Sequence, residues 1–247
     1  MTRIAVFIPT YNEAENIARA VADVRLHVPE ADVFVLDDAS PDGTGAVADD
    51  LATKDKKLFV VHRTEKKGLG AAYLDGFSRG LRDGYDVLIE FDADGSHPAD
   101  VIPALVRALD DTHAGLAIGS RWIAGGSVVD WPRRRLFLSR GGNAYARLML
   151  GLTVHDSTAG FRAYRADCLR ALTLSTVKTK GYGFQVDMTR RVDAAGFAIV
   201  EVPIAFRERT IGESKMSGSI IFEAMWMVTL WGLRRPFDYL QRALSRG

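Results

Sequence analysis

The sequence predicts an α/β fold in which helices cover both faces of a mostly parallel, Rossmann-like sheet. Through the first 120 residues, β-rich apolar runs alternate with segments whose apolar residues recur at helical spacing. Polar clusters stand directly after three of these runs. Such alternation is typical of parallel sheets with helices on both sides. The chain has 247 residues, of which 47% are hydrophobic, so it can bury one sizeable core.

The first half of the chain contains five expected strands and four expected helices. The apolar runs predict strands at residues 4–8, 33–36, 58–61, 87–91 and 115–119. Helical spacing predicts helices over 14–28, from about Ser40 and Pro41, after the glycine-containing loop 66–70, and over 101–109. Ligands bind such sheets at the carboxyl ends of the strands, so the polar clusters at 10–13, 37–42 and 92–97 are expected to converge on one cleft.

The second half is less regular, with a stretch rich in Gly, Trp and Arg at 121–142. We expect a helix at 143–150, a loop and strand within 154–164, a helix at 184–195, and strands at 199–202 and 204–206 separated by Pro203. An apolar helix follows at 219–233. No repeat or linker divides the chain, so residues 1–218 are expected to form one domain. Residues 219–247 would then be a C-terminal helical extension that is not an independent domain.

Composition excludes several classes of protein. The formal net charge is +1, which argues against a nucleic-acid partner, because such proteins usually carry a strong basic excess. The single cysteine, Cys168, excludes a disulfide framework and a cysteine-rich zinc site, and a reducing, cytosolic setting is expected. The apolar run 4–8 is too short for a signal peptide, and no uncharged apolar stretch reaches the roughly 18 residues of a membrane span.

The central chemical motif is Asp92-Ala93-Asp94, directly after a buried strand. Two carboxylates two residues apart can point toward one site, and hard oxygen ligands suit Mg²⁺ or Mn²⁺. Ser96 and His97 stand close enough to contribute a further ligand. The alternative interpretation is an Asp-rich turn that caps the next helix. The apolar run Val87-Leu88-Ile89 before the motif favours a metal site.

Two more clusters follow expected strands. Residues 9–13, Pro-Thr-Tyr-Asn-Glu, offer an aromatic ring and a carboxylate for a base and a ribose, although they also suit the start of a helix. Residues 37–44 offer Asp38 for hydrogen bonds to a nucleoside, although Ser40, Pro41 and Gly43 also favour a turn. Neither a phosphate-binding P-loop nor the dinucleotide pattern G-x-G-x-x-G is present.

Taken together and in this order, the segments IPTYNEAEN, LDDASPDGT, KGLGAAYLDGF, DADGSHP, IGSRW, STAGFRAYR and GESKMSG resemble the polyprenyl-phosphate mannose synthases. These are inverting nucleotide-diphospho-sugar glycosyltransferases with the GT-A fold. The resemblance covers residues 4–218. PTYNE and DxD indicate a nucleotide sugar in general, and the other segments together point to the mannose synthase branch.

The resemblance implies a role for each matching residue. The implied donor-binding residues are Pro9, Tyr11, Glu13, Leu36, Asp38, Asp92, Ala93, Asp94, Ser96, Arg121, Arg209 and Lys215. The implied metal ligands are Asp94 and Ser96, and the implied acceptor-binding residues are Arg121, Arg135 and Ser139. The residues implied to act in catalysis are Asp92, Asp94, Arg121, Arg209 and Lys215. Some relatives have Gln where this chain has Ser96, whose shorter reach makes an intervening water plausible.

The implied reaction is transfer of mannose from GDP-mannose to a polyprenyl phosphate with inversion, which yields a lipid-linked β-mannosyl donor. The acceptor phosphate is largely a dianion at neutral pH and needs no general base. The apolar helix 219–233 would lie in the interface of a membrane, at its cytoplasmic face, with or without a membrane-protein partner subunit. The alternative is that this helix packs in the core or forms a homodimer contact.

Other functions stay open. A polyprenyl-phosphate glucose synthase using UDP-glucose is the nearest alternative. A non-catalytic nucleotide- or lipid-binding module is another, and a sugar-nucleotide pyrophosphorylase is disfavoured because a Gly-rich N-terminal loop is absent.

Overall fold

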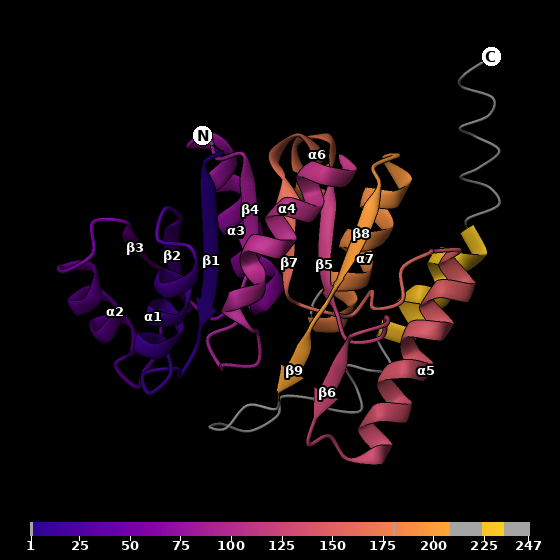
Figure 1. The fold of residues 1–247 in the computed structure, drawn as a ribbon, viewed down its shortest axis with the longest axis horizontal. Helices are drawn as coiled ribbons and strands as arrows, with labels where there is room; N and C mark the ends of the chain where they lie inside the picture. The colour runs from indigo at the N-terminus through magenta and orange to yellow at the C-terminus, as the bar shows by residue number, and fades with distance from the viewer. Residues whose placement is uncertain (1, 180, 208–223, 235–247) are drawn as a thin grey trace.

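The structure is a computed structural model that describes residues 2–179, 181–207 and 224–234. A seven-stranded sheet forms its centre, with strand order β3-β2-β1-β4-β7-β5-β8, and β6 and β9 form a separate parallel pair (Figure 1). The strands are β1 (Ile4–Thr10), β2 (Asp32–Asp37), β3 (Leu58–His62), β4 (Val87–Glu90), β5 (Leu116–Ser120), β6 (Ser127–Val129), β7 (Arg162–Arg165), β8 (Ile199–Pro203) and β9 (Ala205–Arg207).

Helices cover both faces of the sheet, as the sequence predicts. They are α1 (Ile17–His27), α2 (Thr44–Ala52), α3 (Leu69–Arg82), α4 (Ile102–Thr112), α5 (Arg133–Leu150), α6 (Ala166–Ala171) and α7 (Gly181–Ala194), with short 3₁₀ turns at Ala99–Val101 and Leu174–Thr176. Residues 224–234 are also helical. None of the helices in the described ranges has the length and apolarity that crossing a bilayer requires.

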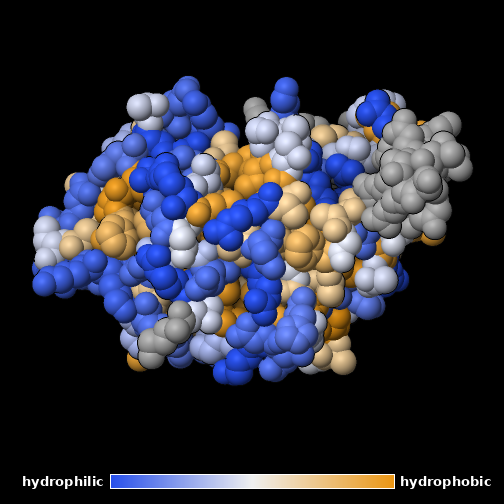
Figure 2. Space-filling view, turned by 90° about the horizontal axis from the view of Figure 1, so that it is seen from above, coloured by the Kyte–Doolittle hydropathy of each residue, from blue (hydrophilic) through white to orange (hydrophobic). Residues whose placement is uncertain are grey.

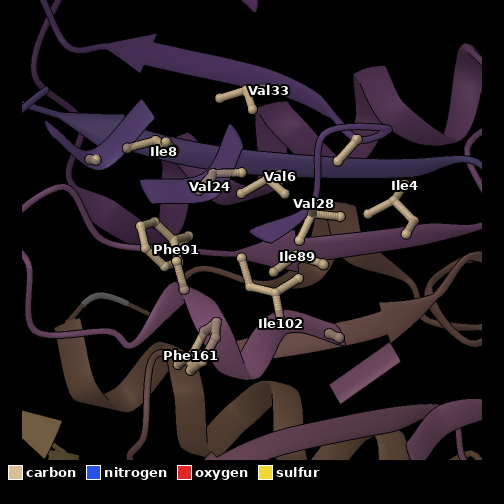
Figure 3. Packing of buried hydrophobic residues seen from close by; sticks show 14 of the residues in the cluster. Ile4, Val6, Ile8, Val24, Val28, Val33, Ile89, Phe91, Ile102 and Phe161 are labelled. Atoms are coloured by element: carbon tan, nitrogen blue, oxygen red, sulfur yellow. The ribbon is translucent and has the colours of Figure 1, made fainter. Parts of the chain in front are cut away.

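Two hydrophobic cores lie on opposite faces of the sheet. Figure 3 shows the first, where Val24 of α1 and Ile102 of α4 pack on strand residues such as Val6 and Ile89. The second core joins Phe7 and Leu36 of the strands to Tyr73 and Phe77 of α3 and to residues of α6 and α7. Because β1 and β4 are buried from both sides, they read as continuous apolar runs rather than alternating ones.

One strand departs from the parallel arrangement. β7 lies between β4 and β5 and runs antiparallel to both, whereas β5 and β8 are parallel. The sheet is therefore mostly parallel, as expected. The antiparallel strand has a consequence for function, because the loop that precedes β7 reaches the edge at which β1, β2 and β4 end.

The helix expected at 143–150 begins ten residues earlier, at Arg133. Gly141 and Gly142 interrupt the helical pattern of the sequence, since mid-helix glycines disfavour a helix by about 1 kcal/mol each. Packing compensates: Ala146 and Leu150 of α5 contact Val228 of the helix at 224–234. These two helices lie side by side beyond the end of the sheet (Figure 1).

The bounds of other strands and helices differ slightly from those expected from the sequence. The strand expected at 87–91 ends at Glu90, the strand expected within 154–164 begins at Arg162, and β6 was not expected because three residues carry too little pattern. The first five residues of the apolar helix expected at 219–233 lie outside the described residues.

Figure 2 shows the molecule from above, after a 90° turn from the view of Figure 1. On this face hydrophilic side chains dominate the outline and apolar ones gather toward the middle.

Close packing between α3 and the sheet generates a stability prediction. A Cβ on Gly76 would stand 2.7 Å from Cδ1 of Phe7 and 3.0 Å from Cδ1 of Leu36. We expect Gly76→Ala to lower the free energy of unfolding by about 1–3 kcal/mol, because overpacking outweighs the gain in helix propensity. Denaturant unfolding followed by circular dichroism measures this difference.

Gly141→Ala is the matched control for Gly76→Ala. Nothing lies within 4 Å of a Cβ built on Gly141, so the same substitution in α5 is expected to raise the free energy of unfolding by about 0.5–1 kcal/mol. Equal effects of the two substitutions would contradict this account of the packing.

Candidate active site

A cleft of about 350 Å³ opens where β1, β2, β4 and β5 end. β2, β1 and β4 are neighbouring parallel strands, so the segments that follow them emerge side by side. Most of the predicted site residues line this cleft: Pro9, Tyr11, Glu13, Asp38, Asp92, Ala93, Asp94, Ser96, Arg121 and Arg135. The convergence of separate polar clusters on one cleft, expected from the strand order, is therefore present.

Of the other four predicted site residues, two lie outside the cleft lining and two lie outside the described residues. The side chain of Leu36 is fully buried in the core and is not part of the cleft lining. Ser139 lines a second, adjoining pocket. Arg209 and Lys215 fall outside the described residues, so their roles stay predictions.

The two loops at the ends of β1 and β2 are held in an unusual backbone conformation. Asn12 and Ala39 have φ of 59° and 54°, in the left-handed region that residues other than glycine rarely adopt. The backbone N–H of Asn12 donates to Oγ of Ser40 at 3.1 Å, and the N–H of Glu13 donates to Oγ1 of Thr44 at 2.9 Å. These bonds tie the loops together. Left-handed alanine costs roughly 1–2 kcal/mol, a strain typical of functional loops.

Asp38 organises the loop that covers one end of the cleft. Its carboxylate accepts hydrogen bonds from the backbone N–H groups of Lys67 and Gly68, both at 3.2 Å, and pairs with the guanidinium of Arg63. The ammonium of Lys66 lies 3.6 Å from the ring centroid of Tyr11. Asp38 is 4% exposed and lines the cleft, and its hydrogen bonds fix the loop that contains Lys67 and Gly68.

The Asp-Ala-Asp motif forms a tight turn after β4. Gly95 has φ of 74°, and the N–H of Ser96 donates to Oδ1 of Asp94 at 3.0 Å. The N–H of Asp92 donates to Nδ1 of His97 at 3.0 Å. His97 is buried and its ring stacks on Phe161, with centroids 5.1 Å apart. His97 therefore orients the turn and packs in the core, rather than standing open as a metal ligand.

Beneath the turn, buried polar groups support Asp92. Tyr73 donates its hydroxyl proton to Oδ1 of Asp92 at 3.0 Å, and burial, reinforced by Asp92, raises the pKa of Tyr73 well above its ordinary value. Burial also raises the pKa of Glu90 to about 8, against the lowering effect of Arg162. Gln185 donates to Oε2 of Glu90 at 2.6 Å. The raised pKa favours the neutral form of Glu90 near neutral pH.

Arg121, directly after β5, is held by a buried network. Its Nε and Nη2 donate to the two carboxylate oxygens of Asp156 at 2.7 and 2.6 Å, and Nη2 also donates to Thr158 at 3.1 Å. Asn143 of α5 donates to Asp156 at 3.3 Å and accepts from Ser157 at 3.0 Å. Asp156 is fully buried, so this bidentate pair locks the guanidinium in place and joins the sheet to α5.

A second pocket of about 90 Å³ lies between α5 and the helix at 224–234. Its lining is largely apolar and includes Leu138, Ala146, Met225 and Val228. Ser139, predicted to bind the acceptor, lines this pocket and not the cleft. Four residues line both cavities: Arg121, Trp131, Arg135 and Thr158. The cleft and the apolar pocket therefore meet at a wall that contains two arginines.

Sequence reasoning did not single out several residues of the cleft. They are Thr10, Lys66, Gly68, Leu69, Ala72, Trp131, Thr158, Gly160, Gly181, Gln185 and Phe206. Thr158 and Gly160 belong to the segment STAGFR, which contributes to the family resemblance but for which the resemblance implies no site residue. A signal that the strand after it runs antiparallel would have placed it at the cleft. His97 was considered as a possible ligand, and the structure shows instead how its ring is used.

The donor set fits a divalent cation that arrives together with a phosphorylated ligand. In the described ranges, no group of three His, Cys, Asp or Glu side chains stands at metal-binding spacing. Mg²⁺ and its close analogues typically take one or two carboxylates plus phosphate oxygens and water, rather than a complete protein cage. Asp94 and Asp92 supply such carboxylates in the cleft, and the buried Ser96 lies beside Asp94.

The sequence of this chain matches known proteins over most of its length. Residues 5–173 match the model of glycosyl transferase family 2. An undecaprenyl-phosphate mannosyltransferase of Micrococcus luteus is 53% identical over 98% of this chain and 99% of that protein. A polyprenol monophosphomannose synthase of Mycolicibacterium smegmatis is 54% identical over 96% of this chain and 89% of that protein.

A solved structure shares the fold. Glucosyl-3-phosphoglycerate synthase of Mycobacterium tuberculosis, in complex with Mn²⁺, UDP and glucosyl-3-phosphoglycerate, superimposes with a TM-score of 0.67 at 22% identity, covering 95% of this chain and 79% of that one. This likeness confirms the GT-A fold expected from the sequence. With the family model and the close relatives, it leads to one conclusion: the chain belongs to glycosyl transferase family 2, among the polyprenyl-phosphate mannose synthases.

Proposed function

We propose that this chain transfers mannose from GDP-mannose to a polyprenyl phosphate with inversion, giving a lipid-linked β-mannosyl phosphate. The observation that carries the proposal is the wall shared by the two cavities. A polar cleft with carboxylates and a pocket with an apolar lining meet at Arg121 and Arg135. A nucleotide sugar suits the first, an isoprenoid phosphate suits the second, and their phosphates would meet beside the arginines.

In this proposal the donor lies in the cleft. Tyr11 and Asp38 would contact the nucleoside, and Asp92 and Asp94 would face the diphosphate. Asp94 and Ser96 would hold Mg²⁺ or Mn²⁺, which supplies positive charge to the leaving diphosphate. Arg209 and Lys215 would add to that charge. Glycosyl transfer to a phosphate dianion needs alignment and charge stabilisation more than a base, and a rigidly held Arg121 provides both.

The acceptor would enter from α5. Of the three consecutive arginines at 133–135, only Arg135 lines the pocket, which supports the proposal that Arg135 meets the acceptor phosphate. Ser139 lies one helical turn further along the same lining. The apolar residues of the pocket would contact the first isoprene units.

A membrane-facing surface accompanies the acceptor pocket. α5 carries five arginines and no acidic residue, and neither Asp nor Glu occurs at 224–234. Large apolar side chains are exposed on these two helices: Phe137, Leu138, Leu148, Met225, Trp226 and Leu233. Basic and apolar groups together suit an anionic lipid surface. We propose peripheral attachment to the cytoplasmic face of a membrane, with room for a membrane-protein partner subunit.

The first experiment measures transfer of labelled sugar into organic-extractable lipid. GDP-mannose, UDP-glucose and GDP-glucose are offered separately with polyprenyl phosphate, with and without Mg²⁺ or Mn²⁺. We expect metal-dependent labelling from GDP-mannose. The rate of transfer should fall by about 100-fold or more in Asp94→Ala, because the cation that stabilises the leaving diphosphate loses a ligand. Asp100→Ala, an exposed acid outside the cleft lining, is the control and should keep its activity.

The outcomes separate the alternatives. Labelling from UDP-glucose instead would keep the mechanism and overturn the sugar donor. Binding of GDP-mannose without any transfer, in the presence of membranes from the source, would favour the non-catalytic binding module.

Filling the apolar pocket tests the acceptor site. Gly142 lines this pocket and Gly141 does not, and a Cβ on either meets nothing within 4 Å. We expect Gly142→Leu to raise the KM for polyprenyl phosphate roughly 10-fold or more, because the side chain occupies the pocket. Gly141→Leu makes the same change one residue away and should leave this KM unaltered. Steady-state kinetics at saturating GDP-mannose give both values; equal KM values for the two variants would argue against this acceptor site.

Vesicle binding tests the membrane surface. Leu148 of α5 is 79% exposed and Leu26 of α1 is 74% exposed. The two residues are therefore matched, since both are leucines on helices with a similar exposed fraction. We expect Leu148→Ser to weaken binding to vesicles of anionic phospholipid by about 10-fold, as loss of one buried leucine predicts. Leu26→Ser should bind like the unaltered protein. Cosedimentation measures both, and equal losses would remove α5 from the contact.

A further inference from the structure

The wall between the two cavities contains an aromatic residue with an unused donor. Trp131 lines both the cleft and the apolar pocket, beside Arg121 and Arg135. Its indole Nε1 is buried, and no hydrogen-bond partner for it exists within the described residues. A buried donor left without a partner costs about 1–3 kcal/mol, and an indole N–H can only donate. The position and the chemistry together call for an acceptor supplied by a ligand.

The charges around Trp131 narrow the identity of that acceptor. The guanidinium of Arg135 lies 4.0 Å from the ring centroid of Trp131, and that of Arg121 lies 5.4 Å from it. Both distances are within cation–π range, so two cations stand near the ring. An acceptor that is favoured next to two guanidinium groups is an anion. In an enzyme that joins a diphosphate sugar to a phosphate, the matching anion is a phosphoryl oxygen.

We propose that Trp131 is a substrate-binding residue whose indole N–H donates to a phosphoryl oxygen at the junction of the two cavities. The inference rests on the proposed function for the nature of the ligands. The phosphoryl oxygen belongs either to the acceptor monoester or to the donor diphosphate, and the experiment below separates the two. Trp131 thereby adds a neutral hydrogen-bond donor beside the two arginines, whose charged guanidinium groups can also donate to phosphoryl oxygens.

Trp122 offers a matched control within the same cluster. Its Nε1 is also buried and lacks a partner in the described part of the chain, and Arg121 lies 5.5 Å from its ring centroid. The two indole rings are 6.3 Å apart. Trp122 lines neither cavity. The missing partner alone therefore does not mark a ligand site, and the difference between the two tryptophans isolates the effect of facing the cavities.

The test compares Trp131→Phe with Trp122→Phe. Phenylalanine keeps an aromatic ring for the arginines and removes the N–H. Isothermal titration measures binding of GDP with Mn²⁺ and, separately, of a short-chain isoprenyl phosphate, and steady-state kinetics give KM for each substrate. We expect Trp131→Phe to weaken one of the two ligands by about 10-fold or more, as loss of a hydrogen bond to a charged group predicts. Trp122→Phe should change either affinity less than twofold.

Each outcome decides something. Weaker binding of the isoprenyl phosphate alone places the contact on the acceptor, and weaker binding of GDP alone places it on the donor. Unchanged binding and KM in Trp131→Phe, or equal losses in both variants, would overturn the inference. Absence of transfer by the unaltered protein would instead contradict the proposed function, while the two binding measurements would still decide whether Trp131 contacts a phosphate.

Discussion

The pairing of Arg121 with Asp156 is the interaction on which the arrangement of the site depends. A fully buried carboxylate is costly unless a cation and further donors satisfy it, and Arg121, Asn143 and Thr158 do so together. The pair joins the end of β5, the loop before β7 and the middle of α5. Removing either partner would leave a buried charge and would break this link between the sheet and the helix. The shared wall between the cavities exists because these three segments are held at one point.

The same pairing changes how Arg121 acts as a phosphate-binding residue. Its charge is partly offset by Asp156 and its orientation is fixed before any ligand arrives. A preorganised guanidinium loses little side-chain entropy on binding and offers a fixed direction for an oxygen ligand. Arg135 is different, since it lies on a helix surface against Trp131. The wall thus combines one rigid cation, one more exposed cation and an aromatic ring near both.

Much of the site was predictable because strand ends in a parallel sheet meet at one edge. Asp38, Asp92 and Arg121 each follow an apolar run, and neighbouring strands bring them together. The side chain of Leu36 belongs to the core, and the donor-binding role that the resemblance implies for this residue stays a prediction. The start of α5 was not predictable, because Gly141 and Gly142 lower local helix propensity and tertiary packing overrides them. Trp131 and Thr158 depend on pairings between distant segments that local patterns do not contain.

The antiparallel strand β7 also affects how the sheet can be completed during synthesis. β4 and β5 never contact each other as neighbours, because β7, which comes later in the chain than both, lies between them. A chain that stops before Arg162 would have β1 to β3 paired but would leave an unpaired edge on both β4 and β5. Open edges of apolar strands are templates for pairing with other chains. Truncations that remove β7 therefore expose edges of β4 and β5, which favour pairing with other chains.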